Sequence, residues 1–257
     1  MKNENKEVEK IHEENADCQP VSEEKTHNNL EKHPKQDFQV ERLAFFSDAV
    51  FAIAITLLII DFKIPDITAN STYQEVLQQL FDLKFHFFAI LFSFFLIATY
   101  WYHHHFLFKY IHNYNSKIIV ANMFVLLPII FFPFTTTFWA ESLVSLGDNI
   151  TTNIDIYVLG FSLFFLNNFF AALATYILYW LATVKYKELS FEIPMQQKIK
   201  FISNVLFKVT FFGILSIVTF ITNNQVIIPL TMIFIFILRK IFIKKIAIKL
   251  IPSTTKD

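Results

Sequence analysis

Three polar side chains at the start of a long apolar run are the best candidates for chemistry in this chain. Arg42 precedes the run, Ser47 and Asp48 lie within it, and the rest of residues 43–62 is apolar except Thr56 and Asp61. At about 1.5 Å per residue this run is about 30 Å long, enough to cross the hydrocarbon core of a bilayer. A carboxylate inside such a run costs on the order of 2–3 kcal/mol on insertion scales, so Asp48 needs a partner, a proton or water.

Partners for Asp48 should lie at its own depth on neighbouring apolar segments. The candidates there are Trp101, His103, His104 and Asn122. We expect some of them to join the motif residues in a network that holds the helix in place, with bonds worth about 0.6–2 kcal/mol each in membranes. Those motif residues are Arg42, Phe46, Ser47 and Asp48. The planar fork of Arg42 can hold a carboxylate or several carbonyls, although it could also simply extend to the membrane interface.

The triplet His103-His104-His105 invites a metal hypothesis. Consecutive helical residues point about 100° apart, so the three rings cannot grip one ion without further ligands, and no Cys or paired carboxylate lies nearby. A role in hydrogen bonding at the membrane boundary is favoured over a metal site, with pH sensing as a further alternative. Nothing resembles a nucleophile with its base, a phosphate-binding loop or a cofactor motif, so we expect no enzyme, no metal and no cofactor.

The composition is that of a polytopic membrane protein. Hydrophobic residues make up 54% of the 257 residues, with 33 Phe and only 3 Gly, which exceeds what a soluble domain needs. The formal net charge is zero, which argues against a nucleic-acid partner. The single cysteine, Cys18, can form no internal disulfide. The first forty or so residues are hydrophilic, so no cleavable signal peptide is expected.

The apolar segments predict an all-α protein with six transmembrane helices. They fall at about 41–62, 84–106, 117–139, 155–184, 201–221 and 226–243. A short amphipathic piece is expected over 73–81, and Pro128 and Pro133 should bend the third helix. Residues 1–38 hold almost no large apolar side chains and are predicted to be a disordered cytoplasmic tail. The membrane domain is assigned to 39–250 and a C-terminal tail to 251–257.

Lysine and arginine placement predicts that both ends lie in the cytoplasm. With the N-terminus inside, the basic loop residues and the basic end that follows Arg239 are cytoplasmic, and the outer loops keep only Lys63 and Lys84. Such a basic amphipathic end suits anionic lipid of the inner leaflet. We therefore expect a multi-pass protein of the cell membrane.

Residues 42–48 read Arg-x-x-x-Phe-Ser-Asp and are followed by Ala-Val-Phe-Ala-Ile-Ala-Ile-Thr-Leu-Leu. This order resembles the first-helix signature of the transmembrane protein 175 family, the lysosomal and prokaryotic potassium channels. The resemblance implies a channel selective for potassium over sodium, with potassium as the permeant ion and the first helix lining the pore. It places Ile53 at the main hydrophobic constriction and Thr56, Leu57 and Ile60 at further pore-lining positions. Because the motif occurs once, it resembles the prokaryotic single-repeat type, which implies a homotetramer in a prokaryotic plasma membrane.

The residues alone leave this assignment open. Ile53, Thr56, Leu57 and Ile60 follow the spacing i, i+3, i+4, i+7 and share one helix face, as a stripe used only for packing would. One such helix cannot enclose a pore, so a channel requires several chains. No Thr-Val-Gly-Tyr-Gly loop is present, so a backbone-carbonyl filter of the usual kind is excluded. The alternative is a proton-coupled secondary transporter that uses Asp48 as its proton site.

Overall fold

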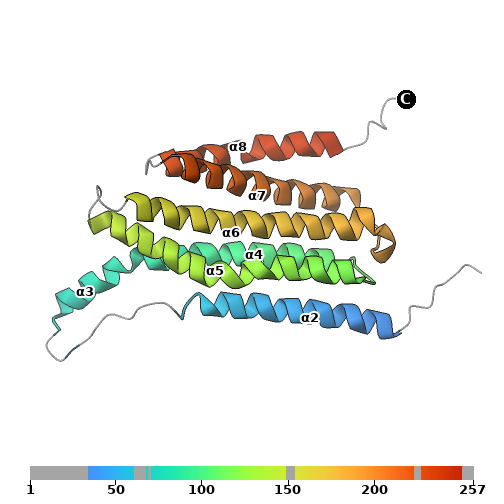
Figure 1. Ribbon diagram of the computed structural model, residues 1–257, viewed down its shortest axis with the longest axis horizontal. Helices are drawn as coiled ribbons and strands as arrows, with labels where there is room; N and C mark the ends of the chain where they lie inside the picture. Colours follow the sequence, from blue (N-terminus) through green and yellow to red (C-terminus); the bar gives the residue numbers. More distant parts are fainter. Residues whose placement is uncertain (1–33, 61–67, 69–70, 149–153, 223–226, 251–257) are drawn as a thin grey trace, which may run out of the picture. The chain divides into compact units, whose positions relative to one another are not determined.

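The computed structural model describes residues 34–60, 68, 71–148, 154–222 and 227–250. Residues from Pro34 onward form one compact unit. Its α-helices are α2 (Pro34–Leu57), α3 (Tyr73–Asp82), α4 (Lys84–Phe108), α5 (Ser116–Asp148), α6 (Ile154–Trp180), α7 (Met195–Ile221) and α8 (Ile227–Leu250) (Figure 1). The all-helical prediction is confirmed. Within the described residues the only β-pairing is an isolated bridge between Ile111 and Ser190.

Each predicted apolar helix has a counterpart, and the amphipathic piece over 73–81 is α3. The largest difference is at α2, which begins at Pro34 and ends at Leu57 instead of spanning 41–62. Proline is favourable in the first turn of a helix because its missing N–H would have no partner there. At the other end, Ile59 and Ile60 bond to carbonyls three residues back, the tighter pattern that closes a helix. The predicted tails lie outside the described residues, except that 34–38 belong to α2.

Four helical stretches in the described residues are long and apolar enough to cross a membrane. They are Lys84–Phe108, Ser116–Val144, Asp155–Lys185 and Met195–Ile221. α2 is not among them, because every stretch of it long enough to cross contains Glu41, Arg42 and Asp48. α8 is also not among them. The structure therefore supports a multi-pass membrane protein, and the count of six spans and the cytoplasmic termini stay predictions.

The core forms where α5 and α6 pack along each other, with α4 against α5 and α7 against α6. α2 packs against α5 and α4, and α8 packs against α7 (Figure 1). Aromatic rings fill the interior: Trp139 of α5 stacks on Phe164 of α6 with ring centroids 4.5 Å apart. α5 and α6 approach each other closely at Gly160, where a Cβ atom would lie 2.2 Å from Ser142 Oγ.

The loops after α4 and α6 are tied together at one end of the bundle. The amide of Phe191 donates to the carbonyl of Tyr110 at 2.7 Å, and the amide of His112 donates to Leu189 at 3.1 Å. A single π-helical turn, Leu181–Lys185, lets the chain leave α6 toward this contact. The C-terminal end of α4, which carries the three histidines, is thereby held by backbone hydrogen bonds.

Candidate functional site

α2 has a buried face and an exposed face. The buried face carries Ser47, Phe51 and Ala54, and Leu58 in the turn after the helix continues it; none of the four is more than 3% exposed. Their spacing of four, three and four residues follows one side of a helix, and that side packs on α4 and α5. The orientation of α2 is therefore fixed by side chains that point away from the Ile53 stripe.

A buried chain of hydrogen bonds runs from α4 through α5 to α2. The Asn122 amide Nδ2 donates to Ser47 Oγ at 2.8 Å, and Ser47 Oγ donates to the Leu43 carbonyl at 2.9 Å. His104 Nε2 lies 2.7 Å from Asn122 Oδ1. With this amide orientation the oxygen can only accept, so His104 carries its proton on Nε2. Each of these three bonds then joins a donor to an acceptor, so the buried side chains of His104, Asn122 and Ser47 all have hydrogen-bond partners.

Asp48 is held separately. Trp101 of α4 donates from its indole Nε1 to Asp48 Oδ1 at 2.9 Å. The Trp101 ring stacks on His105 with centroids 5.4 Å apart, and Asp48 is half-buried. Neighbouring residues on α2 thus reach two different helices, Ser47 to α5 and Asp48 to α4.

The histidine triplet divides among three environments. His104 packs on Phe108 with ring centroids 4.3 Å apart and faces α5 and α2. His105 lies on Trp101, while His103 points toward α7, where its Nδ1 lies 3.3 Å from Lys208 Nζ. The structure thus does not bring His103 to Asp48. In the part of the chain that the structure describes, no group of three or more His, Cys, Asp or Glu could hold a metal ion.

The exposed face of α2 carries the residues that the family resemblance places in the pore. Ile53 is 57% exposed, Leu57 37% and Ile60 69%, and Thr56 is exposed too. The Thr56 hydroxyl donates to the Ile53 carbonyl at 2.9 Å. Ile60 lies in the turn that follows α2.

The exposed stripe continues toward the start of α2. Its members are Arg42, Phe46, Ala49, Ile53, Thr56 and Ile60, alternately four and three residues apart. This is the 3.5-residue period by which helices pack around a common axis. Phe46 and Arg42 thus lie on the exposed side of the helix, away from the Ser47 hydrogen-bond chain.

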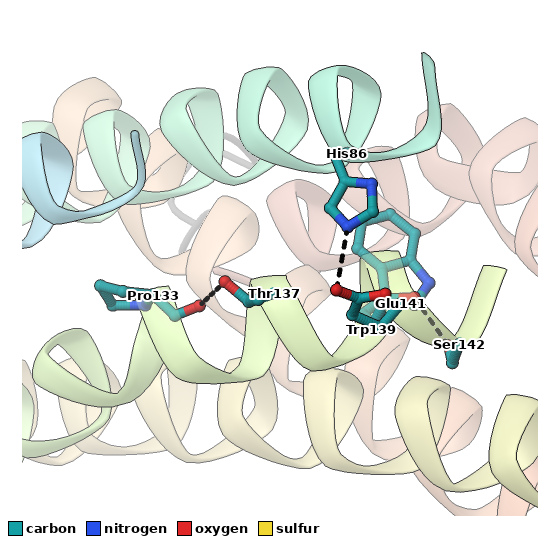
Figure 2. A network of polar contacts seen from close by, with 6 residues as sticks. All are labelled: His86, Pro133, Thr137, Trp139, Glu141 and Ser142. Carbon is teal, nitrogen blue, oxygen red and sulfur yellow. Dashed lines mark hydrogen bonds and ion pairs between the residues drawn. The ribbon is translucent and has the colours of Figure 1, made fainter. Parts of the chain in front are cut away.

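A second polar cluster lies between the start of α4 and the later part of α5 (Figure 2). His86 Nε2 is 3.5 Å from Glu141 Oε1, an ion pair when the ring is protonated. Ser142 Oγ donates to the Trp139 carbonyl at 2.6 Å, and Thr137 Oγ1 donates to the Pro133 carbonyl at 3.1 Å. The latter two bonds return hydroxyls to their own helix, whereas the His86–Glu141 contact joins α4 and α5.

Sequence reasoning missed Lys208, the only charged residue between 201 and 221. Its Nζ donates to Thr99 Oγ1 at 2.9 Å and lies 4.2 Å from the centroid of the Tyr100 ring. The signal was present in the sequence, because a lysine in the interior of a membrane helix marks a functional or structural site.

The fold and these contacts define an all-helical, multi-pass membrane protein whose first described helix presents an apolar face outward. A sequence model of the family described as the endosomal/lysosomal potassium channel TMEM175 matches residues 42–133, from the Arg-x-x-x-Phe-Ser-Asp motif into α5. The resemblance to the transmembrane protein 175 family is therefore confirmed over this part of the chain.

Relatives and a solved structure agree with that match. A protein named potassium channel from Chryseobacterium sp. (strain P1-3) is 34% identical over 37% of this chain and 46% of its own length. Another potassium channel, from Chamaesiphon minutus, is 35% identical over 43% of this chain and 54% of its own length. The matched part thus spans about half the length of these curated relatives. The crystal structure of a lysosomal potassium-selective channel TMEM175 homolog from Chamaesiphon minutus covers 81% of this chain and 98% of that chain, with 24% identity and a TM-score of 0.60. This likeness shows the fold.

Proposed function

We propose that this chain forms a potassium channel that passes potassium in preference to sodium. In this proposal four copies assemble into a homotetramer with α2 around the central axis, and both termini lie in the cytoplasm of a prokaryotic cell. The proposal is supported by the family match over residues 42–133 and by relatives that bear the name potassium channel.

The observation that carries the proposal is the division of α2 into two faces. Ser47, Phe51 and Ala54 face the same chain's α4 and α5, whereas Ile53 and its stripe are exposed. The alternation of four and three residues along the stripe is the pattern that lets helices from several copies meet along their length. One face of α2 is fixed by packing on α4 and α5, and the opposite face exposes a largely apolar stripe. Such a helix is suited to line a narrow pore.

A ring of Ile53 side chains would form the barrier. It offers no oxygen to replace an ion's hydration shell, so an ion must keep or partly shed its water, and a narrow apolar ring can also close by dewetting. Potassium holds its water less tightly than sodium, so the ring would penalise sodium more.

Thr56 would provide a weak site next to that barrier. Its hydroxyl proton is directed to the Ile53 carbonyl, so the lone pairs of its oxygen are left to face a cation or its residual water. Leu57 and Ile60 would extend the apolar lining along the same face. Thr56 is the one residue of this group with a side-chain oxygen.

Ion flux through purified protein in liposomes tests the proposal. A channel produces current that reverses near the potassium equilibrium potential when potassium is the only gradient. Saturable, electroneutral uptake driven by a proton gradient and lost in Asp48→Asn would instead identify the proton-coupled transporter and overturn the channel proposal.

A further inference from the structure

A cavity of about 720 Å³ opens between α4, α7 and α8. One end is polar and cationic, with His103, Asn204, Lys208 and Arg239 in its wall. The other end is lined by Phe92, Phe95, Phe211 and Ile233. Because α4 and α7 run in opposite directions, the residues that come late in α4 lie beside those that come early in α7. The polar end thus falls toward the C-terminal end of α4, and the apolar end lies deeper along the helix.

The positive charges in this cavity have no acidic counterpart on the helices that form it. α4, α7 and α8 contain no Asp or Glu along their whole length. Lys208 contacts the neutral partners Thr99 and Tyr100, and Arg239 donates to Asn204 Oδ1 at 3.4 Å and lies over the Phe207 ring. Charged side chains in membrane helices usually pair with opposite charge or reach water. The chemistry that completes this site is an anion.

The shape of the site selects an anion with a long apolar tail. The polar end can hold a phosphate between an ammonium and a guanidinium, a charge-assisted pairing that favours arginine in particular. The phenylalanine-lined end offers an apolar path for an acyl chain. His103 lies five residues before the end of α4, or about 7.5 Å along the axis, which places the polar end close to the membrane boundary.

We propose that this cavity binds an anionic phospholipid, with its phosphate at Lys208 and Arg239 and an acyl chain along Phe95, Phe211 and Ile233. The lipid would supply the negative charge that α4, α7 and α8 lack and would join α8 to the rest of the bundle. Lys208 and Arg239 lie apart from the exposed stripe of α2, so the site is separate from the proposed pore. The experiment that tests the site measures lipid binding, so its result does not depend on ion conduction.

Native mass spectrometry of the purified protein with phosphatidylglycerol or phosphatidylcholine of identical acyl chains tests this site. The wild type is expected to retain about tenfold more phosphatidylglycerol than phosphatidylcholine, because two basic side chains near a membrane surface each favour anionic lipid. Lys208→Met combined with Arg239→Gln should remove the preference. Lys208→Arg, which keeps the charge, should preserve it.

The matched control is Lys200→Met combined with Lys244→Gln, which removes the same charge from exposed positions of α7 and α8 and should keep the preference. Arg239→Gln alone keeps every Lys208 contact and should give an intermediate value, so loss of folding cannot imitate the result. Equal retention of both lipids by the wild type, or an unchanged preference in the double variant, would overturn the proposal. Displacement of the lipid by glycerol phosphate at equal concentration would also do so, because the acyl chain would then contribute nothing.

Discussion

Trp101 of α4 donates its indole N–H to Asp48 of α2 across 2.9 Å. The residue before Asp48 receives a hydrogen bond from a different helix, since Asn122 of α5 donates to Ser47 at 2.8 Å. Consecutive helical residues point about 100° apart, so these two bonds hold α2 against both rotation and displacement. The motif Phe-Ser-Asp thus explains how one helix can be fixed by its own chain while its opposite face stays exposed.

Trp101→Phe should destabilise the protein, because it keeps a large ring but leaves the Asp48 carboxylate without this donor. Losing a partner for a partly buried polar group costs about 1–3 kcal/mol, which for a chain of this size is a fall of about 2–4 °C in Tm per kcal/mol. Thermal unfolding in detergent measures it. Trp180→Phe, at an exposed indole, is the control. Asp48→Asn in the Trp101→Phe background should recover part of the lost Tm. If the effects of the two substitutions on stability simply add in the double variant, the contact contributes no coupling energy.

The solubilised protein should be a homotetramer, because a single exposed stripe on α2 cannot enclose a pore. Native mass spectrometry should show four copies in the wild type. Ile53→Lys would introduce like charges around the axis, and we expect it to shift the mass toward monomer, whereas Ile217→Lys at an exposed site on α7 should leave four copies. A wild type that is monomeric under every condition would remove the channel proposal.

The sequence predicted the helices well because apolar runs of about twenty residues are specific to membrane spans. The partners of Ser47 and Asp48 could be predicted among Trp101, His104 and Asn122, because the prediction needed only the depth of each residue along its helix. Which face of a helix turns inward was not predictable for α4, whose phenylalanines surround it on every side. For the same reason the direction of His103 toward α7 and the cavity at Lys208 emerged only from the packing. The early end of α2 at Leu57 was missed because the apolar run continues beyond it.

Gly160→Ala should destabilise the contact between α5 and α6. The new Cβ atom would lie 2.2 Å from Ser142 Oγ and 2.6 Å from Ser142 Cβ, and overpacking of this kind costs about 1–3 kcal/mol. Ser142→Gly in the same chain should relieve the clash and raise Tm again. Gly213→Ala serves as a control, because its nearest neighbour is the Phe169 ring at 3.2 Å and a small shift of that ring suffices. A Gly160→Ala variant as stable as the wild type would contradict the close approach.

Acid should loosen the start of α3. The Thr72 backbone N–H donates to the Glu75 carboxylate at 2.9 Å, and this bond, with a second from the Thr72 side chain, lowers the pKa of Glu75 below its ordinary value of 4.5. A carboxyl group whose pKa is lowered by folding stabilises the folded state above its unfolded pKa, and this is lost as the pH falls through the folded pKa. Hydrogen exchange of the α3 amides, corrected for intrinsic rates, should show less protection below about pH 4. Glu75→Gln should remove this dependence, and the same acid response in that variant would assign it to another group.

The reversal potential under bi-ionic potassium and sodium conditions tests the central claim most directly, that ions pass a ring of Ile53. The wild type should favour potassium. Ile53→Asn should raise conductance and lower the potassium-to-sodium permeability ratio, because an amide lets the ring stay wet and offers oxygen to either ion. Thr56→Ala should weaken selectivity without opening the barrier. If Ile53→Asn leaves both conductance and permeability ratio unchanged, α2 does not line the narrow part of the pore and the account is wrong.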